Sequence, residues 1–227
     1  MTTAHAVAAA CLQIVVLAKA PAPGRVKTRL SPTYSPEAAA SLAHAALLDT
    51  VDAMRAAPAG GRFLALDGHV RGPLPAGIQV LRQRGSGLAE RIDHALFDVF
   101  AIARAPMLLV GMDTPQMTAA TLKDAGDLLA EPGVDAVLGL AEDGGFWALG
   151  LCRWTPGLFS GIEMSRADTG QQQLRRLRAA GLRVRLLPSM RDVDTAYDAK
   201  AVAEAAPWSR FACLLHELGR DEEVRVP

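Results

Sequence analysis

Basic side chains gather around a Pro-Gly pair near the start of the chain. They are Lys19, Arg25, Lys27 and Arg29. Lysine and arginine neutralise phosphate charge, and Gly24 allows the backbone to approach an anion closely. We therefore predict that this loop binds the phosphates of a nucleotide, although a solvated basic turn is the common alternative for a charge cluster. The loop is not a Walker A motif, because that motif requires Gly-Lys-Ser/Thr and Val26 stands before Lys27.

Two aspartates that follow predicted strands are candidate ligands of a divalent cation. Asp113 lies in Gly111-Met112-Asp113-Thr114-Pro115, and Asp194 lies in Asp192-Val193-Asp194-Thr195. Carboxylates bind hard cations, with phosphate oxygens and waters as the remaining ligands. A plain turn at Asp113, and a helix cap at Asp192 or Thr195, are the structural alternatives. Capping by Thr195 is compatible with cation binding by Asp194.

The acidic, glycine-containing segment Glu142-Asp143-Gly144-Gly145 could bind an acceptor hydroxyl or amine. We assign Asp143, Gly144 and Gly145 to substrate binding, and Asp143 to binding rather than to proton transfer. A tight turn is the alternative, since Asp-Gly is common in turns. A weaker signal is Gly85-Ser86-Gly87, which leads into a predicted helix and indicates a nucleotide contact at Gly87.

The order of strands and helices indicates how these loops are brought together. Short apolar runs predict strands at 14–18, 62–66, 78–81, 107–110, 136–140, 146–151 and 183–187. Helical spacing and caps predict helices at 35–57, 88–103, 118–130, 168–180, from 195 onward, and at 208–218. This alternation predicts a three-layer α/β/α fold with a mostly parallel mixed sheet. Ligands of such sheets bind beyond the carboxyl ends of the strands, where the four loops lie.

Composition limits the class of protein. The 227 residues are 50% hydrophobic, and 24 basic residues balance 24 acidic ones. A chain without net charge is not expected to bind nucleic acid or an anionic membrane. No apolar run is long enough to span a bilayer and the start lacks the basic residues of a signal peptide, so a cytoplasmic protein is expected. We expect one domain at 13–218, an extension at 1–12 and a polar tail at 219–227, and we assign no oligomeric state.

The four loops together resemble those of one bacterial family. The matching segments are Lys19–Leu30, Gly111–Pro115, Glu142–Phe146 and Asp192–Thr195, and the resemblance covers about Ile14 to Ala205. The family comprises GT-A-type glycosyltransferases often called arsenosugar-biosynthesis-like, and it is related to 2-phospholactate guanylyltransferases. The resemblance implies a GT-A, or nucleotide-diphospho-sugar transferase, fold with the first loop on the nucleotide phosphates. It also implies Mg²⁺ or Mn²⁺ at Asp113 and Asp194.

The sequence departs from the pattern of this family at a few positions. Met112 stands where the family usually has Ser, and Ala89 replaces a usual Gly. Phe146-Trp147 stands where the family usually has Tyr-Tyr. The aromatic change removes two phenol hydroxyls and therefore bears on the identity of the acceptor.

A metal-dependent transferase that acts on a nucleotide or nucleotide sugar and a small acceptor is the function these residues predict. Lys27 and Asp113 are the candidate catalytic residues, because they would neutralise charge on the leaving group directly or through the cation. Two chemistries stay open: glycosyl transfer, which releases a nucleoside diphosphate, and nucleotidyl transfer, which releases pyrophosphate. Four cations in one loop suit a triphosphate slightly better. A non-catalytic binding module is the third alternative, and the presence of Asp113, Asp194 and the basic loop together argues against it.

Overall fold

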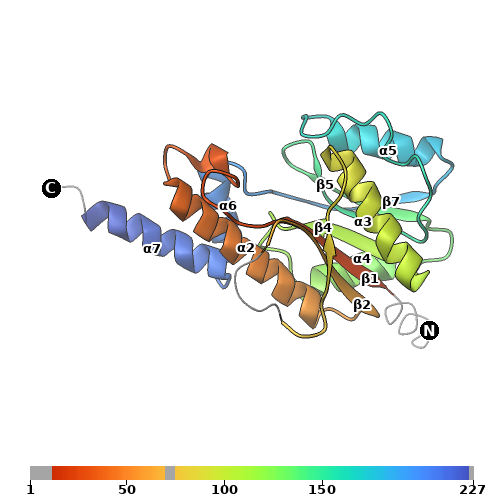
Figure 1. Ribbon diagram of the computed structural model, residues 1–227, viewed down its shortest axis with the longest axis horizontal. Helices are drawn as coiled ribbons and strands as arrows, with labels where there is room; N and C mark the ends of the chain where they lie inside the picture. The colour runs from red at the N-terminus through yellow and green to blue at the C-terminus, as the bar shows by residue number, and fades with distance from the viewer. Residues whose placement is uncertain (1–11, 70–74, 225–227) are drawn as a thin grey trace.

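The computed structural model describes residues 12–69 and 75–224, which form a mixed sheet with helices on both faces (Figure 1). Its strands are β1 (Gln13–Lys19), β2 (Gly61–Asp67), β3 (Gln79–Arg82), β4 (Met107–Gly111), β5 (Ala136–Ala141), β6 (Phe146–Leu151) and β7 (Val184–Met190). The strand order is β3-β2-β1-β4-β6-β5-β7. Only β6 runs antiparallel to its neighbours, β4 and β5. The mostly parallel mixed sheet predicted from the sequence is confirmed.

The helices cover the two faces of the sheet in pairs. They are α2 (Pro36–Ala56), α3 (Leu88–Ala103), α4 (Ala119–Leu129), α5 (Thr169–Ala179), α6 (Ala196–Ala205) and α7 (Arg210–Val224), with a short 3-10 helix, η1 (Thr28–Leu30). Helices α2 and α4 pack on one face, and α3 and α5 pack on the other. Helices α6 and α7 pack against the first half of α2 and form a third, smaller core.

The central strand β1 is buried on both of its faces. Ile14 and Val16 contact the core under α2 and α4, whereas Val15 contacts the core under α3 and α5, because side chains alternate along a strand. All three side chains are fully buried, which stabilises the fold by about 1.5–3 kcal/mol for each. Burial on both faces explains why this strand is a continuous apolar run in the sequence.

Capping side chains begin three of the helices where the sequence predicts them. Ser35 Oγ accepts a hydrogen bond from the amide of Ala38 at the start of α2. Thr118 and Thr195 each form a capping box at the start of α4 and α6. These bonds satisfy amides that have no partner inside the helix. The caps fix where each helix begins and, for α6, fix the end of the loop that contains Asp194.

The predicted boundary at Leu218 differs from the structure. Helix α7 continues to Val224, so the segment predicted as a polar tail is helical over 219–224, and α7 extends away from the sheet in Figure 1. Its last residues lack apolar periodicity but include arginine and glutamate, which have high helix propensity. The extension predicted at 1–12 lies outside the described residues except for Leu12. Within 12–69 and 75–224, no helix combines the length and apolar character needed to cross a membrane.

Candidate functional site

A cavity of about 510 Å³ opens at the edge of the sheet where β1 and β4 end. The turn between β5 and β6 and the segment after β7 also reach it, because β1, β4, β5 and β7 run in the same direction. The predicted site residues that line this cavity are Lys19, Arg25, Lys27, Arg29, Asp113, Asp143, Gly145 and Asp194. Three others, Gly24, Gly87 and Gly144, are not among its lining residues. The structure therefore brings the charged candidates of all four loops together.

Lys27 connects three segments of the chain. Its Nζ lies 2.7 Å from Asp113 Oδ1 and also donates a hydrogen bond to the carbonyl oxygen of Val193. The Lys27 backbone is left-handed, with a φ of 49°, at the start of η1. For a residue other than glycine this conformation costs about 1–2 kcal/mol, and such residues concentrate at functional sites. The two side-chain bonds hold Lys27 in this conformation.

The other cations of the first loop differ in whether they pair with a carboxylate. Arg29 NH1 lies 2.5 Å from Asp194 Oδ2, and this hydrogen bond raises the pKa of Arg29 above its usual value. In contrast, Lys19 and Arg25 form no ion pair with any carboxylate in the described part of the chain. Their charges are available to a ligand in the cavity, whereas the charge of Arg29 is shared with Asp194.

Asp192 is a site residue that sequence analysis considered only as a helix cap. Thr195 is the cap of α6, and Asp192 lines the cavity instead. Its Oδ1 is buried without a hydrogen-bond partner. Burial, and then the negative charges of Asp113 and Asp143, raise the pKa of Asp192 to about 7. Alternation along an extended segment could have revealed it, because Val193 is buried in the core between Asp192 and Asp194.

The carboxylates provide oxygen donors of the kind that a divalent cation prefers, but they do not by themselves form a complete set of ligands. Asp192, with its buried and unpartnered oxygen, lines the same cavity as Asp113, and both carboxylates are hard oxygen donors. Among the described residues, no three His, Cys, Asp or Glu side chains are arranged to hold a metal by themselves. Mg²⁺ commonly takes only one or two carboxylates from a protein and its other ligands from phosphates and water. The residues therefore fit a cation that binds together with a nucleotide.

Close packing requires glycine at position 144 in the turn at 142–145. A side chain at Gly144, whose φ is 91°, would lie 1.9 Å from the carbonyl oxygen of Ala167. The carbonyl oxygen of Gly144 accepts a hydrogen bond of 2.8 Å from the amide of Gly170 in α5. Asp143 Oδ1 accepts one, also of 2.8 Å, from the amide of Gly145. The turn is thus fixed against the segment before α5, with Asp143 at the cavity.

The segment before α5 and the first residue of α5 contribute lining residues that the sequence did not single out. They are Met164, Ser165, Arg166 and Thr169. Ser165 has a left-handed backbone, with a φ of 61°. Thr169 Oγ1 closes this segment by donating to the carbonyl oxygen of Glu163 and accepting from the amide of Arg166. No motif marks this loop, so only its position in the fold connects it to the cavity.

The remaining predictions concern Gly87 and the aromatic pair. Gly87 begins α3, and the preceding amide, that of Ser86, is bound by the Glu90 carboxylate. Hydrogen bonds from Ser86 hold the pKa of Glu90 below its usual value. Phe146 and Trp147 both line the cavity, but Trp147 is buried and its Nε1 donates to the carbonyl oxygen of Pro188, whereas Phe146 is only half-buried. Phe146 is therefore the aromatic departure that bears more directly on a ligand.

Comparison with known proteins identifies the family. The sequence model of the family described as "Uncharacterized protein conserved in bacteria (DUF2064)" matches residues 41–166, more than half of the chain, and the chain belongs to this family. A comparison with curated proteins found no match.

Solved structures confirm the class of fold. A "putative nucleotide-diphospho-sugar transferase" from Desulfovibrio desulfuricans G20 is 28% identical, with a TM-score of 0.82 over 91% of this chain and 94% of that one. Rv0371C from Mycobacterium tuberculosis H37Rv, solved in complex with manganese, is 22% identical, with a TM-score of 0.52 over 85% and 98%. The 2-C-methyl-D-erythritol 4-phosphate cytidylyltransferase from Thermus thermophilus is 17% identical, with a TM-score of 0.51 over 85% and 98%. The fold is that of nucleotide-dependent transferases.

Proposed function

We propose that this protein is a divalent-cation-dependent transferase that moves a group from an activated nucleotide to a small acceptor. The observation that carries the proposal is the 2.7 Å contact between Lys27 and Asp113 in a cavity that Lys19 and Arg25 also line. The D. desulfuricans protein bears the name of a nucleotide-diphospho-sugar transferase, which supports this class of donor. The manganese complex of the M. tuberculosis protein supports the use of a cation.

In this proposal the first loop binds the phosphates of the donor. Lys19 and Arg25 donate charge-assisted hydrogen bonds to phosphate oxygens, which are among the strongest that side chains form. Asp113 and Asp192 are the residues that would hold Mg²⁺ or Mn²⁺, with Asp194 as a further candidate once Arg29 turns to the ligand. A bound cation supplies additional neutralisation of the charge that develops on the leaving phosphate.

The turn at 142–145 and the segment before α5 provide the acceptor side of the cavity. Asp143 is held by the amide of Gly145 and accepts a hydrogen bond from the acceptor hydroxyl or amine. Its role is to orient the attacking atom rather than to take the proton. Orientation alone can supply a large part of a rate enhancement when the reacting atoms are held in contact.

Glycosyl transfer is the principal candidate, with the acceptor attacking the anomeric carbon and a nucleoside diphosphate leaving. Nucleotidyl transfer, with attack at the α-phosphorus and departure of pyrophosphate, is the second candidate. It is favoured by the two cations, Lys19 and Arg25, that lack carboxylate partners in the described chain, because a triphosphate brings one more charged phosphate than a nucleotide sugar.

The experiment combines binding with product detection. Nucleoside triphosphates and nucleotide sugars are screened by thermal shift with Mg²⁺, Mn²⁺ or EDTA, and the ligands that stabilise the protein are then incubated with candidate acceptors. Release of a nucleoside diphosphate supports glycosyl transfer, and release of pyrophosphate supports nucleotidyl transfer. Cation-dependent stabilisation without either product supports the binding module. Absence of any nucleotide-dependent shift contradicts the proposal.

A further inference from the structure

Arg191 joins two segments beside the cavity although it does not line the cavity itself. Its Nε and NH2 lie 2.8 Å and 2.6 Å from Glu142 Oε2 in the turn between β5 and β6. Its NH1 lies 3.7 Å from Asp198 Oδ1 in the first turn of α6. Its guanidinium also stacks on Tyr197, at 5.3 Å from the ring centre. One side chain therefore connects the turn at 142–145 to the beginning of α6.

Backbone hydrogen bonds fix the chain on both sides of Asp192. The carbonyl oxygen of Arg191 accepts a bond of 2.7 Å from Gln116 Nε2. One residue earlier, the carbonyl oxygen of Met190 accepts one from the amide of Glu142, at 3.0 Å. On the other side, the amide of Val193 donates to the carbonyl oxygen of Asp113, at 2.9 Å. Asp192 is thus held between two anchored peptides.

This anchoring opposes an electrostatic force. The Asp192 side chain lines the same cavity as those of Asp113, Asp143 and Asp194, and like charges repel each other. Contacts that anchor the segment after β7 therefore oppose displacement of Asp192 from the cavity when no cation is bound. Arg191 supplies a constraint from outside the cavity, because its partner Glu142 precedes Asp143 in the acceptor turn.

We propose that Arg191 is a positioning residue: its contacts with Glu142 and Asp198 hold Asp192 at the cavity beside Asp113 and make the acceptor turn and the cation side a single rigid unit. The contribution of Arg191 to catalysis rests on the proposed function. The side chains of Arg191 and Glu142 are 31% and 47% exposed, so their ion pair contributes little to the stability of the fold. Removing a residue that orients a metal ligand without contacting the metal typically changes metal affinity 10- to 100-fold.

The test measures Mn²⁺ affinity by the electron paramagnetic resonance of free Mn²⁺, using the full chain. Arg191→Ala and Glu142→Gln are each expected to weaken Mn²⁺ binding at least tenfold, and the double variant is expected to be no weaker than Arg191→Ala. Arg191→Lys is expected to recover only part of the affinity, because lysine lacks the planar fork of arginine. The matched control is Arg185→Ala, which removes an arginine of β7 that also pairs with a glutamate, Glu131, away from the cavity.

Hydrogen exchange provides a readout that does not depend on the proposed function. Arg191→Ala is expected to accelerate exchange at the amides of Glu142 and Val193 while leaving the melting temperature nearly unchanged, and Arg185→Ala is expected to affect neither amide. If the unaltered protein does not bind Mn²⁺, the proposed cation role fails and exchange alone tests the positioning role. Wild-type exchange in Arg191→Ala, or Mn²⁺ affinity within twofold of a wild type that does bind, would overturn the inference.

Discussion

Lys27 Nζ and Asp113 Oδ1 lie 2.7 Å apart at the carboxyl ends of the central strands, and Lys27 makes this contact from a left-handed backbone. The lysine side chain is only 10% exposed, whereas that of Asp113 is 43% exposed. A buried cation and an accessible carboxylate leave Asp113 open to a second partner on the cavity side. The pair thus connects the basic first loop, which we propose binds phosphate, to the candidate cation ligand.

The first prediction distinguishes the effect of the left-handed Lys27 backbone on stability from the effect of the Lys27 charge on turnover. Lys27→Ala and Lys27→Gly both remove the cation and are expected to reduce turnover by at least 100-fold. Glycine avoids about 1–2 kcal/mol of left-handed strain but makes the unfolded chain more favourable by about 0.4–1 kcal/mol. We therefore expect Lys27→Gly to be more stable than Lys27→Ala by about 0.5–1 kcal/mol, measured by urea denaturation.

Arg104 provides the matched control, because it has the same φ of 49° at the end of α3 and does not line the cavity. Arg104→Gly is expected to exceed Arg104→Ala in stability by a similar amount, with turnover at the wild-type level in both. Equal stability of the glycine and alanine variants at both positions would contradict the account of left-handed strain.

The second prediction concerns the carboxylate. Asp113→Asn keeps the shape of the side chain but removes its charge, and it is expected to abolish cation-dependent turnover. It also weakens the contact with Lys27, so a loss of stability of about 1–2 kcal/mol is expected. Asp135→Asn removes a carboxylate that pairs with Arg183 outside the cavity and should leave turnover unchanged. Full cation-dependent activity in Asp113→Asn would remove Asp113 from the proposed site.

The sequence predicts the fold because its signals are local. The apolar run of β1, the caps at Ser35 and Thr118, and glycines at the turns each depend on neighbours in the chain. The convergence of the basic loop with Asp113 was also predictable, since parallel strands end at one edge of a sheet.

Other features depend on contacts between distant segments. The perturbed Asp192 requires the charges of Asp113 and Asp143 beside it, and the role of Gly144 requires Ala167 against its Cα. The lining by Ser165 and Arg166 comes from a loop without periodicity or motif. Sequence patterns do not report these distances, so these residues could be placed only in three dimensions.

The third prediction tests phosphate binding by the cations that lack carboxylate partners. Lys19→Met and Arg25→Met are each expected to weaken nucleotide affinity by about 10- to 100-fold, because each removes a charge-assisted hydrogen bond worth about 1.5–3 kcal/mol. Melting temperatures should stay close to wild type, since no ion pair within the described residues is lost. Titration calorimetry at two salt concentrations provides the measurement.

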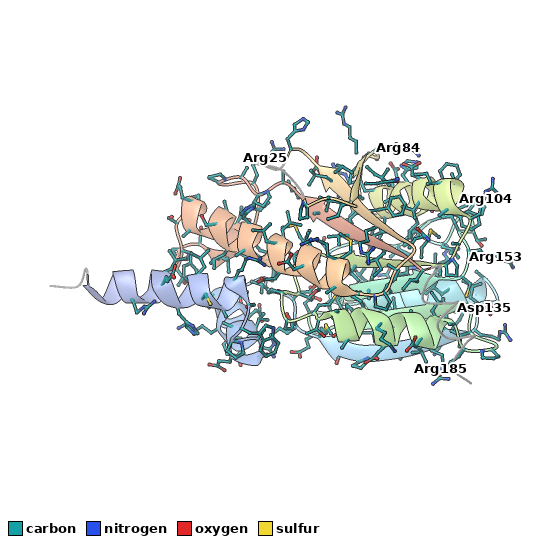
Figure 2. All side chains as sticks on the ribbon, turned by 90° about the horizontal axis from the view of Figure 1, so that it is seen from below. Arg25, Arg84, Arg104, Asp135, Arg153 and Arg185 are labelled. Carbon is teal, nitrogen blue, oxygen red and sulfur yellow. The ribbon has the colours of Figure 1, made fainter. Side chains whose placement is uncertain are left out.

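Arg153→Met is the control for this titration, because Arg153 is exposed and lies far from Arg25 in Figure 2. It should leave the nucleotide affinity unchanged at both salt concentrations. A loss of affinity in Arg153→Met equal to that in Arg25→Met would indicate a general charge effect rather than a phosphate site.

The fourth prediction concerns pH. The pKa of Asp192 is raised to about 7 in the folded state, from 3.8. Between these two pKa values the folded state binds a proton that the unfolded state has released. Titration of Asp192 therefore lowers the free energy of unfolding as pH rises from about 4 to 7, and it has no further effect above pH 7. Asp192→Asn lacks this titration. In EDTA, the stability advantage of the variant over wild type should therefore grow from pH 4 to pH 7 and then stay level, and a constant difference would contradict the assignment.

Diffraction from crystals grown with Mn²⁺ and a nucleotide that stabilises the protein tests the central claim most directly, because manganese is located by its anomalous signal. The account predicts one manganese peak within coordinating distance of Asp113, with phosphate oxygens of the nucleotide between that ion and the side chains of Lys19 and Arg25. A nucleotide bound elsewhere on the molecule, or manganese remote from Asp113, would contradict it.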